Sequence, residues 1–287
     1  MSTPQQPPTQ ALQPPVAPDW QAAPGTSFAP YTSPIPVTRT HLGHALASEW
    51  TKIKSVRSTL WTLGVFLVLV IGIGLLVAGQ TTDENFGNVP YTIPAFFGLV
   101  LGQICLITLG VLVISSEYGT GMIRTTFTAS PQRHRVLAAK LIIFFAVAFV
   151  VSAFAIGFVG VVTESMHNAG EGKAWGGTVV KGALYVSLLG VLALAVGSML
   201  RHSAGAITAM LGLVLVPAIL PAFLMLSESM QWIGQKMLEY NAPNSLAKIF
   251  GLDDGDTIGG GAQLGLLAGV TAVAIAGAFV LLDRRDV

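Results

Sequence analysis

Long apolar stretches alternate with short polar segments along this chain. Windows of about 20 residues, the length of a helix that crosses a bilayer, find six such stretches, at 60–79, 93–115, 137–162, 183–200, 204–226 and 263–282. In the first, thirteen of the residues from Leu60 to Val77 are Leu, Ile, Val or Phe, which together favour insertion by about 4–8 kcal/mol. The pattern predicts an all-α integral membrane protein with six transmembrane helices. The boundary of the fourth stretch stays open, because the short link Arg201-His202-Ser203 follows it.

The charged residues support this prediction and suggest an orientation. Only 10% of the 287 residues are charged, whereas soluble domains carry about a quarter. Cytoplasmic loops are enriched in Lys and Arg, and with the N-terminus inside, eleven of these residues fall inside and four outside. The inside group is Arg39, Lys52, Lys54, Arg57, Arg124, Arg133, Arg135, Lys140, Arg201, Arg284 and Arg285, and the outside group is Lys173, Lys181, Lys236 and Lys248. We therefore expect both termini to be cytoplasmic.

The N-terminal segment 1–38 differs in composition from the rest. It holds ten of the 16 prolines, with few large aliphatic residues, which predicts a disordered, Pro/Gln-rich cytoplasmic tail. Its PxxP pattern, from Pro4 to Pro7, could dock on a partner, but proline-rich tails often contain this pattern by chance. The six-span membrane domain is then expected over 39–287.

An amphipathic helix is expected between this tail and the first span. In "HLGHALASEWTKIKSVRST", Leu42, Leu46, Trp50 and Ile53 recur at helical spacing. We expect this helix to lie in the membrane interface, where four residues would anchor it to headgroups. These anchors are Trp50, Lys52, Lys54 and Arg57. The alternative is a plain juxtamembrane linker.

The segment between the second and third spans concentrates polar residues. It reads "SSEYGTGMIRTTFTASPQRHRVLAAKL" from 115 to 141. We expect Glu117 to reach interface water, Gly119 and Gly121 to allow a turn, and 122–128 to form a short helix with Thr120 as a possible N-cap. Ser130-Pro131 would end that helix. The alternative is an ordinary basic cytoplasmic loop.

The same segment resembles the cytoplasmic segment of ABC transporter permeases of the type-2 exporter family, in its actinobacterial form. The shared pattern is Glu-Tyr, Gly-Thr, Ile-Arg, Ser-Pro, a basic cluster and Leu-x-x-Lys. Three more stretches resemble that family, namely "SEWTKIKSVRSTLWTL", "GSMLRHSAGAITAMLGLVLVP" and "DRRDV". The resemblance covers about residues 42–287.

This resemblance implies that the segment at about 116–135 contains a coupling helix that docks on a separate ATPase subunit. Arg124 and Arg133 would then hydrogen-bond acidic groups of the ATPase, and Glu117 would hold the helix relative to the second span. The full set of implied contact residues is Glu117, Tyr118, Gly119, Thr120, Ile123, Arg124, Thr125, Ser130, Pro131 and Arg133. The resemblance also implies two permease subunits, identical or paralogous, in a bacterial plasma membrane, with ATP and Mg on the ATPase.

Motifs for chemistry within this chain are lacking. A phosphate-binding loop needs GxxxxGK[ST], and the nearest match, "GEGKAW" at 170–175, lacks the first glycine and the final Ser or Thr. The five histidines do not share a metal-site spacing with carboxylates. We therefore expect no enzyme activity, bound cofactor, metal or nucleic-acid partner for this chain. The predicted function is export of a hydrophobic or amphipathic cargo. The alternatives are a non-transporting membrane scaffold or regulatory subunit that docks a cytoplasmic ATPase and, less favoured by the uncharged spans, a secondary carrier.

Three further features concern packing. The GxxxG pairs Gly98–Gly102 and Gly265–Gly269 allow close helix contact, within the chain or between copies. Pro217 and Pro221 should kink the fifth span. The segment 227–262 is partly amphipathic, and we expect short helices there that rest on the outer leaflet.

Overall fold

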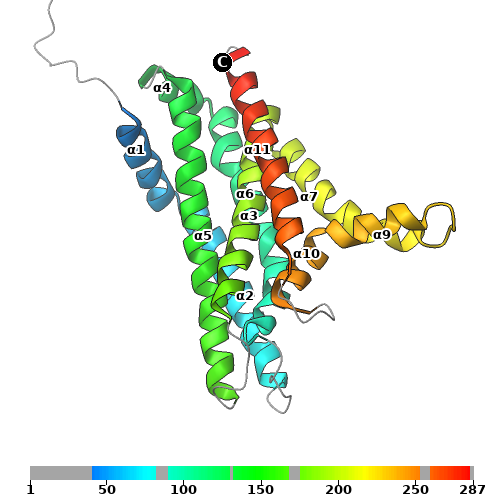
Figure 1. Ribbon diagram of the computed structural model, residues 1–287. Helices are drawn as coiled ribbons and strands as arrows, with labels where there is room; N and C mark the ends of the chain where they lie inside the picture. The colour runs from blue at the N-terminus through cyan, green and yellow to red at the C-terminus, as the bar shows by residue number, and fades with distance from the viewer. Residues whose placement is uncertain (1–40, 82–89, 130–131, 168–174, 253–258, 285–287) are drawn as a thin grey trace, which may run out of the picture. The chain divides into compact units, whose positions relative to one another are not determined.

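The computed structural model describes residues 41–81, 90–129, 132–167, 175–252 and 259–284. Over these residues it contains eleven helices and no strand (Figure 1). Their bounds are α1 Leu42–Ser55, α2 Arg57–Gln80, α3 Ile93–Gly119, α4 Met122–Ala129, α5 Arg133–Met166, α6 Gly176–Leu200, α7 Ser203–Ile219, α8 Pro221–Leu224, α9 Gln231–Tyr240, α10 Ala242–Phe250 and α11 Gly261–Arg284. The tail predicted over 1–38 lies outside the described residues.

Six helical segments are long and apolar enough to cross a membrane, namely α2, α3, α5, α6, α7 with α8, and α11. This confirms the predicted all-α membrane fold with six spans. Five of the six spans extend beyond their apolar stretches, and α6 begins at Gly176, well before the predicted start at 183. The reason is that hydropathy detects only the part of a helix at hydrocarbon depth, whereas backbone hydrogen bonds continue into the polar flanks.

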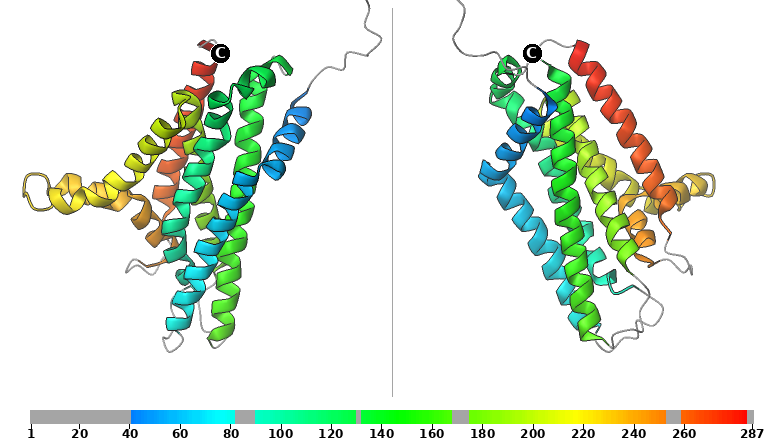
Figure 2. Two further views of the ribbon diagram at one scale, coloured as in Figure 1. Left: turned by 180° about the vertical axis from the view of Figure 1, so that it is seen from behind. Right: turned by 60° about the vertical axis from the view of Figure 1, so that its left-hand side comes forward.

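The helix α6 lies at the centre of the bundle, between α3, α5 and α11 (Figures 1 and 2). In its most apolar window 72% of the residues are buried within the chain, against 11% for α11. A buried helix needs apolar or small residues on every side, and α6 meets this requirement with Ala, Gly, Leu and Val around its whole circumference. The fourth stretch, although the shortest in the sequence, is therefore the most enclosed span.

Glycine allows α2 and α3 to cross closely. A Cβ atom on Gly98 would lie 2.6 Å from the Cα of Val70, and one on Gly102 would lie 2.9 Å from Cγ2 of Val70. The first GxxxG pair thus packs within the chain. Around Gly265 and Gly269, by contrast, a Cβ would meet no atom within 4 Å, so the second pair lies on an open face of α11.

The connection from α6 to α7 consists of two residues. Arg201 has φ of +54°, and the His202 side chain caps α7 by accepting a hydrogen bond from the Gly205 N–H at 3.1 Å. Further on, α7 contains Pro217 and ends at Ile219, and α8 starts at Pro221. The fifth span is therefore interrupted at Leu220, between α7 and the four-residue α8, and α7 continues through Pro217.

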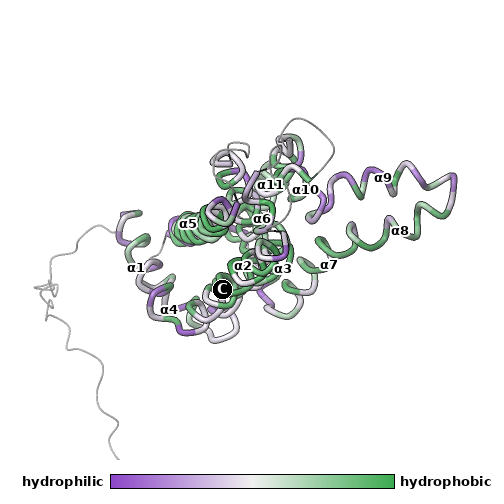
Figure 3. Tube along the Cα trace, turned by 90° about the horizontal axis from the view of Figure 1, so that it is seen from below, coloured by the Kyte–Doolittle hydropathy of each residue, from purple (hydrophilic) through white to green (hydrophobic). Residues whose placement is uncertain are grey.

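After α8 the chain projects away from the bundle and returns through α9 (Figures 1 and 2). Seen end-on, α7 and α8 are mostly hydrophobic and α9 is mixed (Figure 3). Leu226 is 84% exposed and Trp232 67% exposed. We call residues 221–240 the projecting arm.

The helix α10 corrects the expectation that the whole 227–262 segment rests on a membrane surface. Leu246, Ile249 and Phe250 are fully buried, and α10 contacts both α3 and α6. The ring of Phe250 lies 6.2 Å from that of Phe96. The apolar side of α10 is thus covered by protein, because its side chains fill the space between two spans.

Candidate functional site

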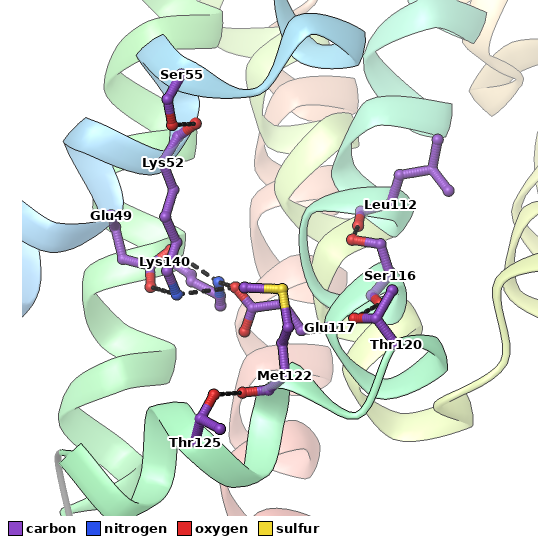
Figure 4. A network of polar contacts seen from close by, with 10 residues as sticks. All are labelled: Glu49, Lys52, Ser55, Leu112, Ser116, Glu117, Thr120, Met122, Thr125 and Lys140. Carbon is purple, nitrogen blue, oxygen red and sulfur yellow. Dashed lines mark hydrogen bonds and ion pairs between the residues drawn. The ribbon is translucent and has the colours of Figure 1, made fainter.

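Four charged side chains from three helices meet near the end of the bundle that carries α4 (Figure 4). They are Glu49 and Lys52 of α1, Glu117 of α3 and Lys140 of α5. Glu49 and Lys52 are three residues apart and so share one face of their helix. Glu117 stands two residues before the end of α3. Lys140 stands seven residues after the start of α5 at Arg133, about 10 Å along the axis. We call this set the ion network.

Every contact in the ion network is short. The Lys140 ammonium donates to Oε2 of Glu49 at 2.7 Å and to Oε1 of Glu117 at 2.6 Å. The Lys52 ammonium donates to Oε1 of Glu49 at 2.8 Å and to the same Oε1 of Glu117 at 2.9 Å. Each lysine thus bridges both glutamates, and α1 is bound to α3 and α5 at once.

Burial makes these contacts important for stability. The side chain of Lys140 is 1% exposed, and those of Glu49 and Glu117 are 5% and 9% exposed. Two positive and two negative charges compensate one another, whereas removal of one partner from a buried pair costs about 3–5 kcal/mol. The expectation that Glu117 reaches interface water is therefore wrong, because two lysine ammoniums take the place of water around it.

The same geometry affects the pKa of Lys52. Partial burial acts to lower this pKa, but the hydrogen bonds and charges of Glu49 and Glu117 outweigh burial and raise it above its ordinary value. Lys52 consequently remains protonated throughout the physiological range. Its ammonium group thus bonds two glutamates of the protein, a contact that its prediction as a lipid anchor did not include.

One carboxylate oxygen of the ion network has no hydrogen-bond partner among the described residues. This atom is Oε2 of Glu117, which is fully buried. Glu117 lines a cavity of about 250 Å³ that lies between α1, the start of α2, and the end of α3. Lys52, Glu49 and Lys140 line the same cavity, which has charged and apolar walls.

The turn after α3 differs from the predicted one in detail. Gly121 has φ of +73°, a conformation that glycine adopts at low cost, while Gly119 is the last residue of α3. Thr120 does not cap α4, because its hydroxyl donates back to the Ser116 carbonyl at 2.8 Å. The Arg124 N–H instead bonds to the Gly121 carbonyl at 3.2 Å. The sequence correctly predicted a short helix here, and the structure assigns Thr120 to the end of α3.

The predicted contact residues on α4 divide into two sides. Ile123 is 4% exposed and faces the bundle, whereas Arg124 and Thr125 are exposed. Met122 is also exposed, but its side chain lines the cavity beside the ion network. The side of α4 that is accessible to a partner therefore contains Arg124 and Thr125.

The remaining predicted contact residues stiffen the connection between helices. The Arg133 guanidinium lies over the Phe127 ring at 5.4 Å, and this contact joins α4 to the start of α5. The Arg201 guanidinium lies over the ring of the half-buried Tyr118 at 5.0 Å. Both arginines thus have aromatic partners within the chain. Ser130 and Pro131 lie outside the described residues.

The other predicted anchors lie on α1 and at the first residue of α2. Trp50 and Arg57 are exposed, and the Lys54 ammonium lies 5.1 Å from the Trp50 ring centre. The most buried side chain of α1, however, belongs to Glu49. No role was predicted for Glu49 from the sequence, and Lys140 was counted only among the cytoplasmic charges. The three-residue spacing that places Glu49 and Lys52 on one helix face was the one sequence signal for the ion network.

In the part of the chain that the structure describes, no group of three or more His, Cys, Asp or Glu side chains is arranged to hold a metal ion.

No protein-family model matches the sequence, and no curated protein matches it either. The fold and the site define the chain as a multi-pass helical membrane protein. Four of its ionisable side chains are joined where three helices meet at one end of the bundle.

Proposed function

We propose that this protein is the transmembrane permease subunit of an ATP-binding-cassette exporter. In this proposal α4 is the coupling helix, which docks on a separate ATPase subunit that binds ATP and Mg. A second permease copy or a paralogue completes the transporter in the bacterial plasma membrane, with both termini cytoplasmic. The cargo is hydrophobic or amphipathic and moves outward.

The arrangement of α4 carries this proposal. A helix that passes on the motion of a partner must be exposed on one side and firmly connected to membrane spans on the other. Exposed Arg124 and Thr125 meet the first requirement. Buried Ile123 and the contact between Arg133 and Phe127 meet the second.

The ion network supplies a rigid base next to α4. Glu117 stands five residues before Met122 and is bonded to both Lys52 and Lys140. A force applied to α4 would therefore act on α1, α3 and α5 together. The separate ATPase is required in this proposal because no phosphate-binding loop is found in the sequence.

The proposal is tested by reversing one charge on α4. Tagged wild-type protein should co-purify with an ATPase subunit that mass spectrometry identifies by its phosphate-binding-loop peptide, and Arg124→Glu should abolish that co-purification. Arg57→Glu is the matched control, because Arg57 is exposed but lies on α2. Retention of the ATPase by Arg124→Glu, or failure of the wild type to retain one, would count against the proposal.

A second measurement distinguishes an exporter from a scaffold. In proteoliposomes that contain the purified complex, an exporter should show ATP hydrolysis that rises with a hydrophobic cargo. A complex that forms normally but whose ATPase rate responds to no cargo would instead indicate a scaffold.

The orientation of the protein is tested with a thiol introduced at Met122 in a Cys105→Ala background. Labelling of this thiol by an impermeant reagent from outside the cell would overturn the cytoplasmic assignment of α4.

A further inference from the structure

The ion network beside the cavity has both hydrogen-bond donors and a hydrogen-bond acceptor that no described residue uses. An ammonium group has three N–H donors, and among the described residues Lys52 and Lys140 each donate to two carboxylate oxygens. One N–H of each lysine is therefore left for another acceptor. Oε2 of Glu117, buried and without a partner, needs a donor.

Three of the five hydroxyl groups that line the cavity are placed to act as acceptors. The Thr62, Ser116 and Thr120 side chains line it. Their hydroxyls donate to carbonyls of their own helices, Thr62 to Ser58 at 2.8 Å and Ser116 to Leu112 at 2.5 Å, and Thr120 does the same. Since their protons are used, these oxygens present lone pairs to the cavity. A bound group must then donate several hydrogen bonds and accept at least one.

Charge restricts the occupant further. The ion network carries two positive and two negative charges, so a simple anion would face both glutamates and a simple cation both lysines. A zwitterion avoids this repulsion if its cation lies at Glu117 and its anion at Lys52. A primary ammonium supplies three N–H donors, whereas a quaternary ammonium supplies none.

Size and position indicate where such a zwitterion comes from. The cavity of about 250 Å³ falls below the roughly 300–1,000 Å³ of sites for drug-sized ligands, so it fits a headgroup and not a whole lipid. Ile53, Val56 and Leu112 form an apolar wall beside the charged one. Glu117 lies near the end of a span, where lipid headgroups are found.

We propose that this cavity binds the headgroup of a phospholipid with a primary amine, of the phosphatidylethanolamine class. The ammonium group donates to Oε2 of Glu117 and to the hydroxyl oxygens, and the phosphate accepts the remaining N–H of Lys52. The glycerol backbone and the first acyl carbons lie along the apolar wall. This site does not depend on the proposed export function.

The test compares lipids on the purified full-length protein in detergent. Short-chain phosphatidylethanolamine should raise the thermal unfolding midpoint in a saturable manner, and native mass spectrometry should detect a retained molecule. Phosphatidylcholine should half-saturate at a roughly tenfold higher concentration, because it offers no N–H to Glu117. Equal effects of the two lipids would overturn the proposal. So would an equal effect of water-soluble phosphoethanolamine, which would indicate a site for a free solute.

A pair of matched variants locates the effect. Thr62→Leu places apolar bulk in the cavity without touching an ion pair, and it should abolish the preference for phosphatidylethanolamine. Thr108→Leu is the control, because Thr108 also bonds to the carbonyl four residues earlier, at 2.8 Å, but does not line the cavity. The preference should survive in Thr108→Leu. Its survival in Thr62→Leu would contradict the assignment.

Discussion

The ion network and the projecting arm represent opposite ways of placing charge in this protein. In the ion network, four charged side chains are buried and each lysine bonds two glutamates. In the arm, Lys236 and Glu239 also form an ion pair, at 2.7 Å, but the Lys236 side chain is 66% exposed. Distances alone do not distinguish the two sites. The surroundings decide, because water competes for exposed charges and not for buried ones.

Removing the buried lysine should have the largest effect. Lys140→Met leaves Glu49 and Glu117 close together with only Lys52 to compensate them, and we expect a loss of about 3–5 kcal/mol in the free energy of unfolding. Reversible unfolding in mixed micelles with increasing SDS would measure it. Lys236→Met is the control in the arm and should leave the unfolding midpoint nearly unchanged. Equal effects of the two variants would refute the contrast.

A double variant tests whether Lys140→Met lowers the free energy of unfolding because it leaves the buried charges unbalanced. Combining Lys140→Met with Glu117→Gln removes one charge of each sign and leaves Glu49 paired with Lys52. We expect the two changes together to cost less than their sum, with an interaction energy of about 1–3 kcal/mol. Additive effects would mean that the two side chains act independently.

An intermediate effect is expected where glycine allows two spans to touch. In Gly98→Ala the new methyl group would meet the Val70 backbone at 2.6 Å, so α2 and α3 must separate, at a cost of about 1–3 kcal/mol. Gly72→Ala in α2 meets nothing within 4 Å and should instead stabilise its helix by about 0.5–1 kcal/mol. The same unfolding measurement applies, and a destabilised Gly72→Ala would argue against this explanation.

The smallest effect is expected from Lys52, and it should depend on pH. We expect Lys52→Met to cost about 1 kcal/mol at neutral pH, because this lysine is partly exposed. The folded-state pKa is raised above the ordinary lysine value of 10.5, so the contribution is complete below pH 10.5 and is lost as pH rises through the folded-state pKa. Unfolding curves of both proteins on either side of that pH would show the difference shrink; a difference that stays constant would contradict the assigned pKa shift.

These regions also show what the sequence reveals. The six spans could be predicted because hydrocarbon demands about 20 apolar residues whatever the neighbours are. The pairing of Lys140 with Glu49 could not, since 91 residues separate them and no local pattern encodes which helices meet. For the same reason, Leu246 and Phe250 suggested a surface helix, although α3 and α6 cover them. The segment around α4 was located through its turn residues, whereas the buried position of Glu117 depends on two other helices.

The short link between α6 and α7 limits how the molecule can deform. With only Arg201 and His202 between the two helices, α7 cannot slide lengthwise past α6, and swivelling about this corner is the movement left to it. Arg201 also covers the Tyr118 ring at 5.0 Å, one residue from the end of α3. Any rotation of α7 and the projecting arm is thereby coupled, through Arg201 and Tyr118, to the end of α3, after which α4 begins.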